Sequence, residues 1–257
     1  MRLIRSLAIG SLAGGMLLTV EVAHAWDDEL RESETFFGAE FASDQDFVQY
    51  ELLIRTMLAE AFADNVRTRM VALPALSTEW VVGLRVREQG EWEVFVLKPT
   101  ISARSYGVRE DARKELVQKR ASPGASATET REIEAQLRDI ERGLPQDPRS
   151  VPIERCVVPL SDAVAARVQA SWIATLRGAV KRDAPPFPYV RVIGDGWSYH
   201  FSQDGNPPLA AEVSNPEAEW PSGKLAALGT ALRAYCQHPN RSTERQVLSA
   251  AASALPR

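Results

Sequence analysis

The stretch that decides the fold is 77–99, STEWVVGLRVREQGEWEVFVLKP. Apolar and polar residues alternate over 82–86, which is the period of a half-buried strand. Residues 92–97 are apolar on both sides, so this second strand is expected to lie nearer the centre of its sheet. Gln89 and Gly90 between the two segments are typical of a short turn. The stretch therefore predicts a β-hairpin within an antiparallel sheet.

Helices are predicted on both sides of this hairpin. Upstream, apolar residues recur at helical spacing over 46–64, and Asp44 or Asp46 would cap the start. Downstream, a helix capped by Ser161 or Asp162 carries an apolar stripe made of Val164, Val168, Trp172, Leu176 and Val180. A further helix is predicted over 225–236. The last helix, 242–255, is rich in alanine and is expected to be loosely held.

The remaining strands include a second predicted hairpin. Residues 151–160 and 209–213 each predict a strand. Asp195-Gly196 is a favoured two-residue turn, and it would join strands 189–193 and 197–202. Alternation in the second of these puts Trp197, Tyr199 and Phe201 on one face, which is expected to be core. It puts Ser198, His200 and Ser202 on the other face, which is expected to meet solvent or line a groove.

Hairpins mixed with helices predict an α+β fold with a largely antiparallel sheet. We expect a single domain over 26–257, interrupted by a charged helical insertion at 107–148. Ile133, Leu137, Ile140 and Leu144 form a narrow apolar stripe within this insertion. One interpretation is a projecting helical hairpin that grips a partner. The favoured alternative is a solvated excursion whose stripe packs on the body.

The N-terminal 25 residues predict an export signal. Arg2 and Arg5 precede an apolar run, and Ala23-His24-Ala25 is a small-residue cleavage site. Its removal would leave 232 of the 257 residues and 28 basic against 33 acidic residues, a net charge of −5. This balance gives no electrostatic reason to expect nucleic acid. No second apolar run is long enough to span a membrane. The protein is therefore expected to be periplasmic or secreted.

The two cysteines, Cys156 and Cys236, both follow this signal. An even number of cysteines in an exported protein favours a disulfide, and the alternative is two buried thiols that never meet. A metal site would need more ligands than the sequence offers, because only His200 and His238 remain after the signal. We expect neither a metal nor a cofactor.

The sequence contains no catalytic motif that would indicate a reaction. The chain beyond residue 25 lacks a G-x-S-x-G elbow, a phosphate-binding P-loop and a dinucleotide-binding glycine motif. Ser198 and His200 would lie roughly 6 to 7 Å apart on one strand face, too far for a catalytic dyad. No catalytic residue is assigned. The candidate binding surface consists of Ser198, His200, Ser202 and Glu79.

Four segments together resemble an uncharacterised family of exported proteins of Gram-negative bacteria. They are LPALSTEWVVGL (73–84), CVVPLSDAVAARVQASWIATL (156–176), DGWSYHFS (195–202) and SGKLAALGTALRAYC (222–236). The resemblance covers most of the chain outside the charged insertion, and its motifs are short. It implies an envelope protein and supplies no catalytic residues. Some proteins of this kind are encoded near interbacterial toxin systems, which implies an inhibitor or immunity role.

The leading hypothesis is a non-enzymatic periplasmic module that binds another protein, with a secreted toxin as one such partner. The oligomeric state is left open. A second hypothesis is a hydrolase with an unrecognised site near His200 and Glu79. A third is a passive structural component of the envelope.

Overall fold

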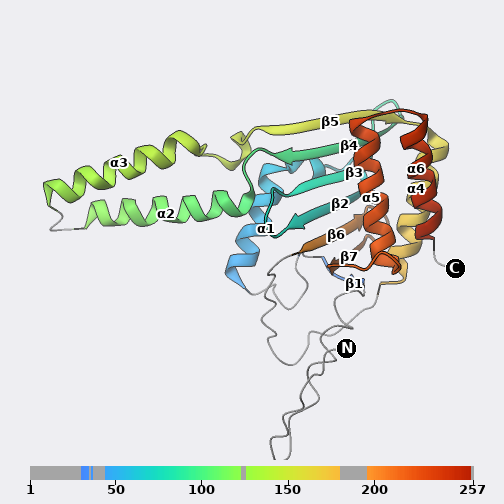
Figure 1. Cartoon of the computed structure of the whole chain (residues 1–257), viewed down its shortest axis with the longest axis horizontal. Coiled ribbons are helices and arrows are strands. Elements are labelled where there is room, and N and C mark those ends of the chain that lie inside the picture. The colour runs from blue at the N-terminus through green and yellow to red at the C-terminus, as the bar shows by residue number, and fades with distance from the viewer. Residues whose placement is uncertain (1–29, 35, 37–43, 123–125, 180–195, 256–257) are drawn as a thin grey trace, which may run out of the picture.

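A single antiparallel sheet organises the computed structural model, which describes residues 30–34, 36, 44–122, 126–179 and 196–255. Seven strands lie in the order β1-β7-β6-β2-β3-β4-β5, and every neighbouring pair is antiparallel. The α+β class is therefore confirmed (Figure 1). The strands are β1 (Arg31–Glu32), β2 (Val66–Pro74), β3 (Trp80–Val86), β4 (Trp92–Pro99), β5 (Ile153–Leu160), β6 (Trp197–Gln203) and β7 (Leu209–Ser214).

The hairpin predicted from 77–99 is present as β3 and β4. Val86 pairs with Trp92, and Gly90 adopts a φ of +84° in the connecting turn. A residue without a Cβ adopts this left-handed conformation at little cost. The expectation that the second strand is the more central is wrong. β3 lies one strand nearer the middle than β4, and both strands are buried on both faces because helices cover the two sides of the sheet.

The centre of the sheet is β2, which the sequence analysis did not predict. It pairs with β3 on one side and with β6 on the other. Each edge of β6 is occupied, by β2 and by β7. The hairpin partner of β6 is thus the predicted strand at 209–213, observed as β7. The predicted strand at 189–193 and the residue Asp195 lie outside the described residues.

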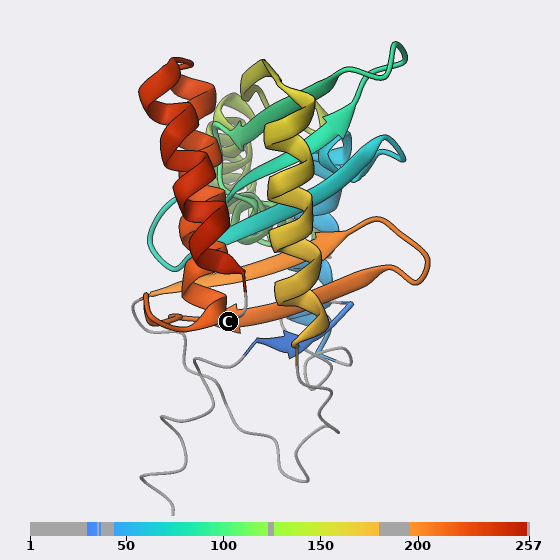
Figure 2. The ribbon, with the colours of Figure 1, turned by 90° about the vertical axis from the view of Figure 1, so that its right-hand side faces the viewer.

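Three helices cover one face of the sheet: α4 (Asp162–Arg177), α5 (Pro221–Gln237) and α6 (Arg241–Ala254). Figure 2, viewed from their side, shows them in front of the strands. The predicted stripe of α4 is buried at all four of its described positions, while Val180 lies outside the described residues. The core under these helices includes Trp172 and Phe201, whose ring centroids are 5.9 Å apart in an edge-to-face pair.

The expectation that the last helix is loosely held is wrong. Val247, Ala251 and Ala254 of α6 are buried in the core. The hydroxyl of Ser171 on α4 donates to the carbonyl of Ala251 at 2.7 Å, and Thr175 donates to the carbonyl of Ala254 at 2.8 Å. Small alanine side chains allow this close approach, so two α4 hydroxyls satisfy carbonyls in the last turns of α6 that a helix end leaves unpaired.

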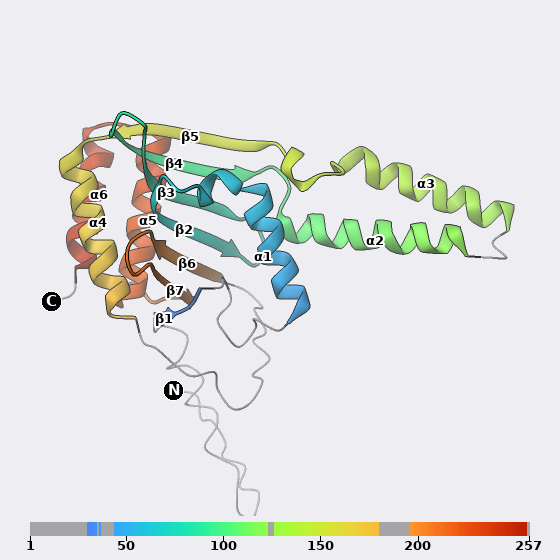
Figure 3. The same ribbon diagram turned by 180° about the vertical axis from the view of Figure 1, so that it is seen from behind.

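The opposite face carries α1 (Gln45–Met57) and a 3₁₀ turn, η3 (Ala59–Phe62). Figure 3 shows α1 and the group α4–α6 on opposite sides of the strands. As predicted, Asp44 caps α1 by accepting from the backbone N–H of Asp46 at 3.0 Å. A second core lies beneath α1 and includes Ile54, Phe95 and Phe36.

The charged insertion forms an arm of two antiparallel helices, α2 (Ala103–Ala121) and α3 (Ala127–Gly143), which projects from the body (Figure 1). A further 3₁₀ turn, η4 (Pro148–Ser150), leads back to β5. Leu137 and Leu144 of the predicted stripe are buried, and Leu144 joins the core beneath α1. The arm thus projects, and the base of its stripe packs on the body. Within the described residues, no helix is both long and apolar enough to cross a membrane.

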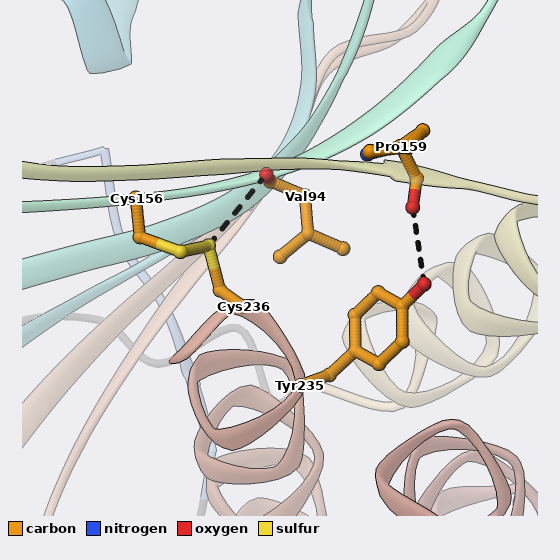
Figure 4. Close-up of a disulfide and its surroundings, with 5 residues drawn as sticks. All are labelled: Val94, Cys156, Pro159, Tyr235 and Cys236. Carbon is orange, nitrogen blue, oxygen red and sulfur yellow. Dashed lines mark hydrogen bonds between the residues drawn. A yellow bond between two sulfur atoms is a disulfide. The ribbon is translucent and has the colours of Figure 1, made fainter. Parts of the chain in front are cut away.

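The predicted disulfide is present. Cys156 on β5 is bonded to Cys236 near the end of α5, with the two Cα atoms 5.9 Å apart (Figure 4). The Sγ atom of Cys236 lies 3.9 Å from the carbonyl oxygen of Val94. The neighbouring Tyr235 donates its hydroxyl to the carbonyl of Pro159 at 3.1 Å. β5, the edge strand on one side of the sheet, is therefore attached to α5 by one covalent bond and one hydrogen bond.

Candidate functional site

The four residues of the predicted binding surface are all buried. Ser198, His200 and Ser202 expose 3%, 2% and 7% of their surface, and Glu79 exposes 1%. The sequence predicts that the polar face of 197–202 meets solvent or lines a groove; it does not meet solvent, and one of its members, Ser198, lines the groove described below. On the aromatic face, the expectation of core holds for Phe201, whereas Trp197 is 38% exposed at the start of the strand. A binding role for the four residues stays a prediction.

His200 is held beneath the N-terminal segment that contains β1. Its Nε2 lies 3.1 Å from the carbonyl oxygen of Ser33, which fixes Nε2–H as the donor. The ring of Phe36 packs on the imidazole with a centroid separation of 5.1 Å. Burial lowers the pKa of His200 to about 3, and the nearby guanidinium groups of Arg69 and Arg55 act in the same direction. His200 is therefore a neutral, structural side chain at neutral pH.

Neither of the serines that flank His200 on this strand face, Ser198 and Ser202, is hydrogen-bonded to it. Ser198 and Ser214 share a hydrogen bond of 2.7 Å between their hydroxyl groups, across β6 and β7. The hydroxyl of Ser202 has no partner among the described residues. Neither serine is hydrogen-bonded to His200, so no Ser-His dyad forms. Strand geometry predicted this absence for Ser198 and His200.

Glu79 joins three elements at the base of the arm. It lies just before β3, accepts the hydroxyl proton of Tyr50 on α1 at 2.6 Å, and accepts the backbone N–H of Ala103 on α2 at 3.0 Å. The carboxylate therefore lies at the N-terminus of α2, where the helix dipole favours negative charge. Burial, followed by the Glu79 charge and hydrogen bond, raises the pKa of Tyr50 far above its ordinary value.

A groove opens next to this junction, between α1, α2 and the end of β2. Its volume is about 880 Å³, which is within the range of ligand and peptide clefts. Tyr50 and Leu53 contribute from α1, and Arg104 and Val108 from α2. Ser198 is the one member of the predicted binding surface that lines it. Glu79 lies behind the wall and holds Tyr50 and Ala103 in place.

The lining of the groove is more acidic than basic. It contains four carboxylates and two cations, a formal charge of −2, from Asp44, Asp46, Glu110, Asp111, Arg104 and Lys114. Glu110 pairs with Arg113 at 2.7 Å and Asp111 with Lys114 at 3.0 Å. Asp44, Asp46 and Arg104 make no ion pair with the described residues.

Apolar side chains lie exposed on the same two helices. Val108 on α2, which lines the groove, exposes 67% of its surface. Val48 and Leu52, one turn apart on α1, expose 44% and 54%. Val48 and Leu52 do not line the groove, and exposed single hydrophobic residues are common. Val108, which is part of the lining, is the exposed apolar residue that favours an interaction site there.

The arm is held rigidly where it borders the groove. The hydroxyl of Tyr106 donates to the carbonyls of Pro145 and Gln146 at 2.9 and 3.1 Å, which ties α2 to the chain after α3. A Cβ on Gly107 would approach Leu53 to 3.3 Å, so α1 and α2 are close at this point. The groove is therefore a preformed feature between well-anchored helices.

Sequence reasoning missed most of this groove. The sequence places Tyr50 and Leu53 in the apolar stripe of a predicted helix, and Val108 in the charged insertion. The one available signal was Glu79, a carboxylate without an obvious local role, but nothing in the sequence identified Tyr50 and Ala103 as its partners.

Among the described residues, no group of three or more His, Cys, Asp or Glu side chains is placed to hold a metal ion. No protein-family model, curated protein or solved structure matches the chain.

Proposed function

We propose that this protein is an exported module that binds another protein in the groove between α1 and α2, and that it acts as an inhibitor or immunity protein. The observation that carries the proposal is the groove itself, about 880 Å³ in volume and placed at the base of a projecting arm. A preformed concave surface reduces the ordering cost of association. The arm extends the contact area along α2.

The groove favours a partner surface with a basic and an apolar character. Asp44 and Asp46 lie at the N-terminal end of α1 without ion pairs among the described residues, and Val108 offers exposed apolar surface on α2. Charge complementarity of this kind steers association and sets orientation. A segment with a Lys or Arg next to aliphatic side chains would complement both features.

Export to an oxidising compartment is part of the proposal. The N-terminal 25 residues have the pattern of a removable signal. The bond between Cys156 and Cys236 is of the kind that persists in oxidising compartments. Both observations support a periplasmic or secreted location.

The positions of His200 and Glu79 weigh against the hydrolase hypothesis built on them. The imidazole is covered by Phe36, and both carboxylate oxygens of Glu79 accept structural hydrogen bonds. A general base must reach the proton it removes. These side chains instead stabilise the wall of the groove and the N-terminal segment, which favours a binding function.

The proposal is tested by comparing variants in capture from periplasmic extract. Val108→Arg places a cation in the acidic groove and should repel a basic partner. Leu255→Arg makes the same change at an exposed aliphatic residue directly after α6, a helix on the opposite side of the sheet from α1. A partner identified by mass spectrometry should be captured by the parent protein and by Leu255→Arg, and at least about tenfold less by Val108→Arg.

Two results would contradict the proposal. One is equal capture of every stable partner by Val108→Arg and the parent protein. The other is the absence of any stable partner, together with an envelope defect on deletion that appears without a toxin, which would favour a passive structural role.

A further inference from the structure

The two edges of the sheet differ greatly in length. β1, at one edge, has two residues, whereas β5, at the other, has eight. Unpaired strand edges expose backbone groups that can pair with another chain, and a very short edge strand limits this. The sheet is therefore blunted at β1 and open at β5.

The register identifies which backbone groups of β5 point away from the sheet. Thr100 donates its N–H to the carbonyl of Pro152 at 2.9 Å, so this pair is hydrogen-bonded. Alternation along an antiparallel ladder makes Glu154, Cys156 and Val158 the next residues that bond to β4. The N–H and C=O groups of the other residues, Ile153, Arg155 and Val157, then point outward. The carbonyl of Ile153 accepts from the Arg155 guanidinium at 3.4 Å and keeps a second lone pair for another donor.

Pro159 agrees with this assignment. It falls in a pair without ladder hydrogen bonds, opposite Glu93, so its missing N–H would have pointed outward. Proline is tolerated in edge strands at such positions. Its outward carbonyl accepts from Tyr235 (Figure 4). The open part of the edge therefore runs from Ile153 to Val157.

No described strand or helix covers this open part. β5 pairs with β4 alone, and it forms the upper border of the molecule in Figures 1 and 3. Val157 is 36% exposed, and its β-branched side chain suits a strand that another strand could extend. Between Ile153 and Val157 the strand contains no proline and two charged residues, Glu154 and Arg155, of which only Arg155 belongs to the outward-pointing set.

We infer that two copies of this chain associate edge to edge through β5, antiparallel, with Arg155 on the two-fold axis. In this register Ile153 faces Val157 of the second copy, and the three outward N–H groups of each copy find carbonyl acceptors. Facing β-branched residues are favourable cross-strand pairs. The sequence of the edge is thus complementary to itself.

A neighbouring register satisfies fewer of the open backbone groups of the edge. With Cys156 on the axis, Ile153 would face Pro159, which has no N–H to donate. The cost of the chosen register is that Arg155 faces Arg155 of the second copy. Glu60 offsets this charge, because its carboxylate accepts from Arg155 at 3.2 Å in each copy.

The dimer would have a consequence for binding. A two-fold axis perpendicular to the sheet keeps both α1 faces on the same side, and it directs the two arms in opposite directions. Two grooves would then be available to one partner assembly, and simultaneous contacts raise the overall affinity. The dimer itself rests on the β5 edge and is independent of what the groove binds.

The inference is tested by light scattering after size exclusion, on the chain from Trp26 onward with its disulfide intact. The parent protein should be a dimer at about 100 µM chain. Val157→Pro removes one outward N–H, as Pro159 already does nearby, and should raise the dimer dissociation constant at least about tenfold. Val157→Thr keeps the N–H and the branched shape and should remain dimeric.

A pair of double variants tests the register. Ile153→Lys with Val157→Lys places like charges opposite each other and should give a monomer. Ile153→Lys with Val157→Glu places opposite charges in the same positions and should restore the dimer. A monomeric parent protein at about 100 µM, or an equal dissociation constant for both double variants, would overturn the inference. The double variants carry the test if Val157→Pro does not fold.

Discussion

His200 and Glu79 are polar side chains in the interior, and each is held by a backbone group from a distant part of the chain. Ser33, 167 residues before His200, supplies the carbonyl that accepts from the imidazole. Ala103, 24 residues after Glu79, supplies the N–H that the carboxylate accepts. Buried polar groups are stable only when such partners are present. At the scale of single residues, these two therefore position segments and do not present reactive groups.

A neutral buried histidine makes stability depend on pH. The folded pKa of about 3 lies below the ordinary value of 6.5, so the unfolded chain binds a proton more readily between these values. The stabilising contribution is complete above pH 6.5 and is lost as the pH falls towards 3. We expect urea unfolding to show a free energy that decreases on acidification, with up to about 1.4 kcal/mol per pH unit from this residue.

His200→Gln separates this contribution from that of the carboxylates. Glutamine keeps an N–H donor for the carbonyl of Ser33 and does not titrate, so the variant should have a shallower pH dependence than the parent protein over pH 4 to 6.5. Parallel pH profiles for the two proteins would contradict the assignment of a neutral, buried imidazole.

For single residues, the sequence alone predicted which side chains share one face of a strand. Ser198, His200 and Ser202 do lie on one face of β6, as alternation predicted. That this face is covered depends on Ser33 and Phe36, whose sequence neighbourhood has no clear periodicity. Local patterns cannot reveal cover that comes from a distant segment.

At the scale of elements, the predicted helices and the β3–β4 hairpin are present because each has a clear local period; Asp44 also caps α1, whereas Ser161 stands at the N-cap of α4 without a side-chain cap bond. The central strand β2 was missed although Val66, Thr68 and Met70 alternate with arginines. Its remaining residues, Val71–Pro74, are buried on both sides and carry no alternation. A strand of mixed pattern next to a helix end is difficult to recognise from the sequence alone.

The junction at Glu79 connects α1, β3 and α2, and its removal should loosen the arm. Glu79→Ala leaves the hydroxyl of Tyr50 and the N–H of Ala103 without their acceptor, at a cost of about 2–3 kcal/mol. We expect this loss in chemical denaturation, and faster hydrogen exchange in the first turn of α2.

Glu154→Ala is the matched control for this junction. Glu154 pairs with Lys98 at 3.4 Å on the surface, and an exposed pair of this kind contributes less than about 1 kcal/mol. A loss of stability in Glu79→Ala no greater than in Glu154→Ala would show that the buried carboxylate does not hold the arm.

At the scale of the whole molecule, one sheet with helices on both faces carries an arm between β4 and β5, and a disulfide holds the strand to which the arm returns. Cys156 and Cys236 are 80 residues apart. Closing a loop of this length stabilises the folded state by about 4 kcal/mol in the chain-entropy model. The even cysteine count and the export signal predicted this bond, whereas the geometry of the groove depends on the packing of α1 against α2, which no local pattern reveals.

Removing the disulfide should weaken the whole fold cooperatively. We expect Cys156→Ala with Cys236→Ala to unfold at lower denaturant, with a loss of about 2–4 kcal/mol. The parent protein should shift by a similar amount on reduction, whereas the double variant should not respond to a reductant. A gel that shows the same mobility with and without reductant, together with two reactive thiols, would contradict the bond.

The central claim is that a partner binds in the groove between α1 and α2. Hydrogen exchange of the chain with and without its captured partner tests this claim most directly. The account predicts slower exchange in 44–53 and 103–114, which line the groove, and unchanged exchange in α6. Protection confined to other parts of the molecule, with these two segments unchanged in the complex, would contradict it.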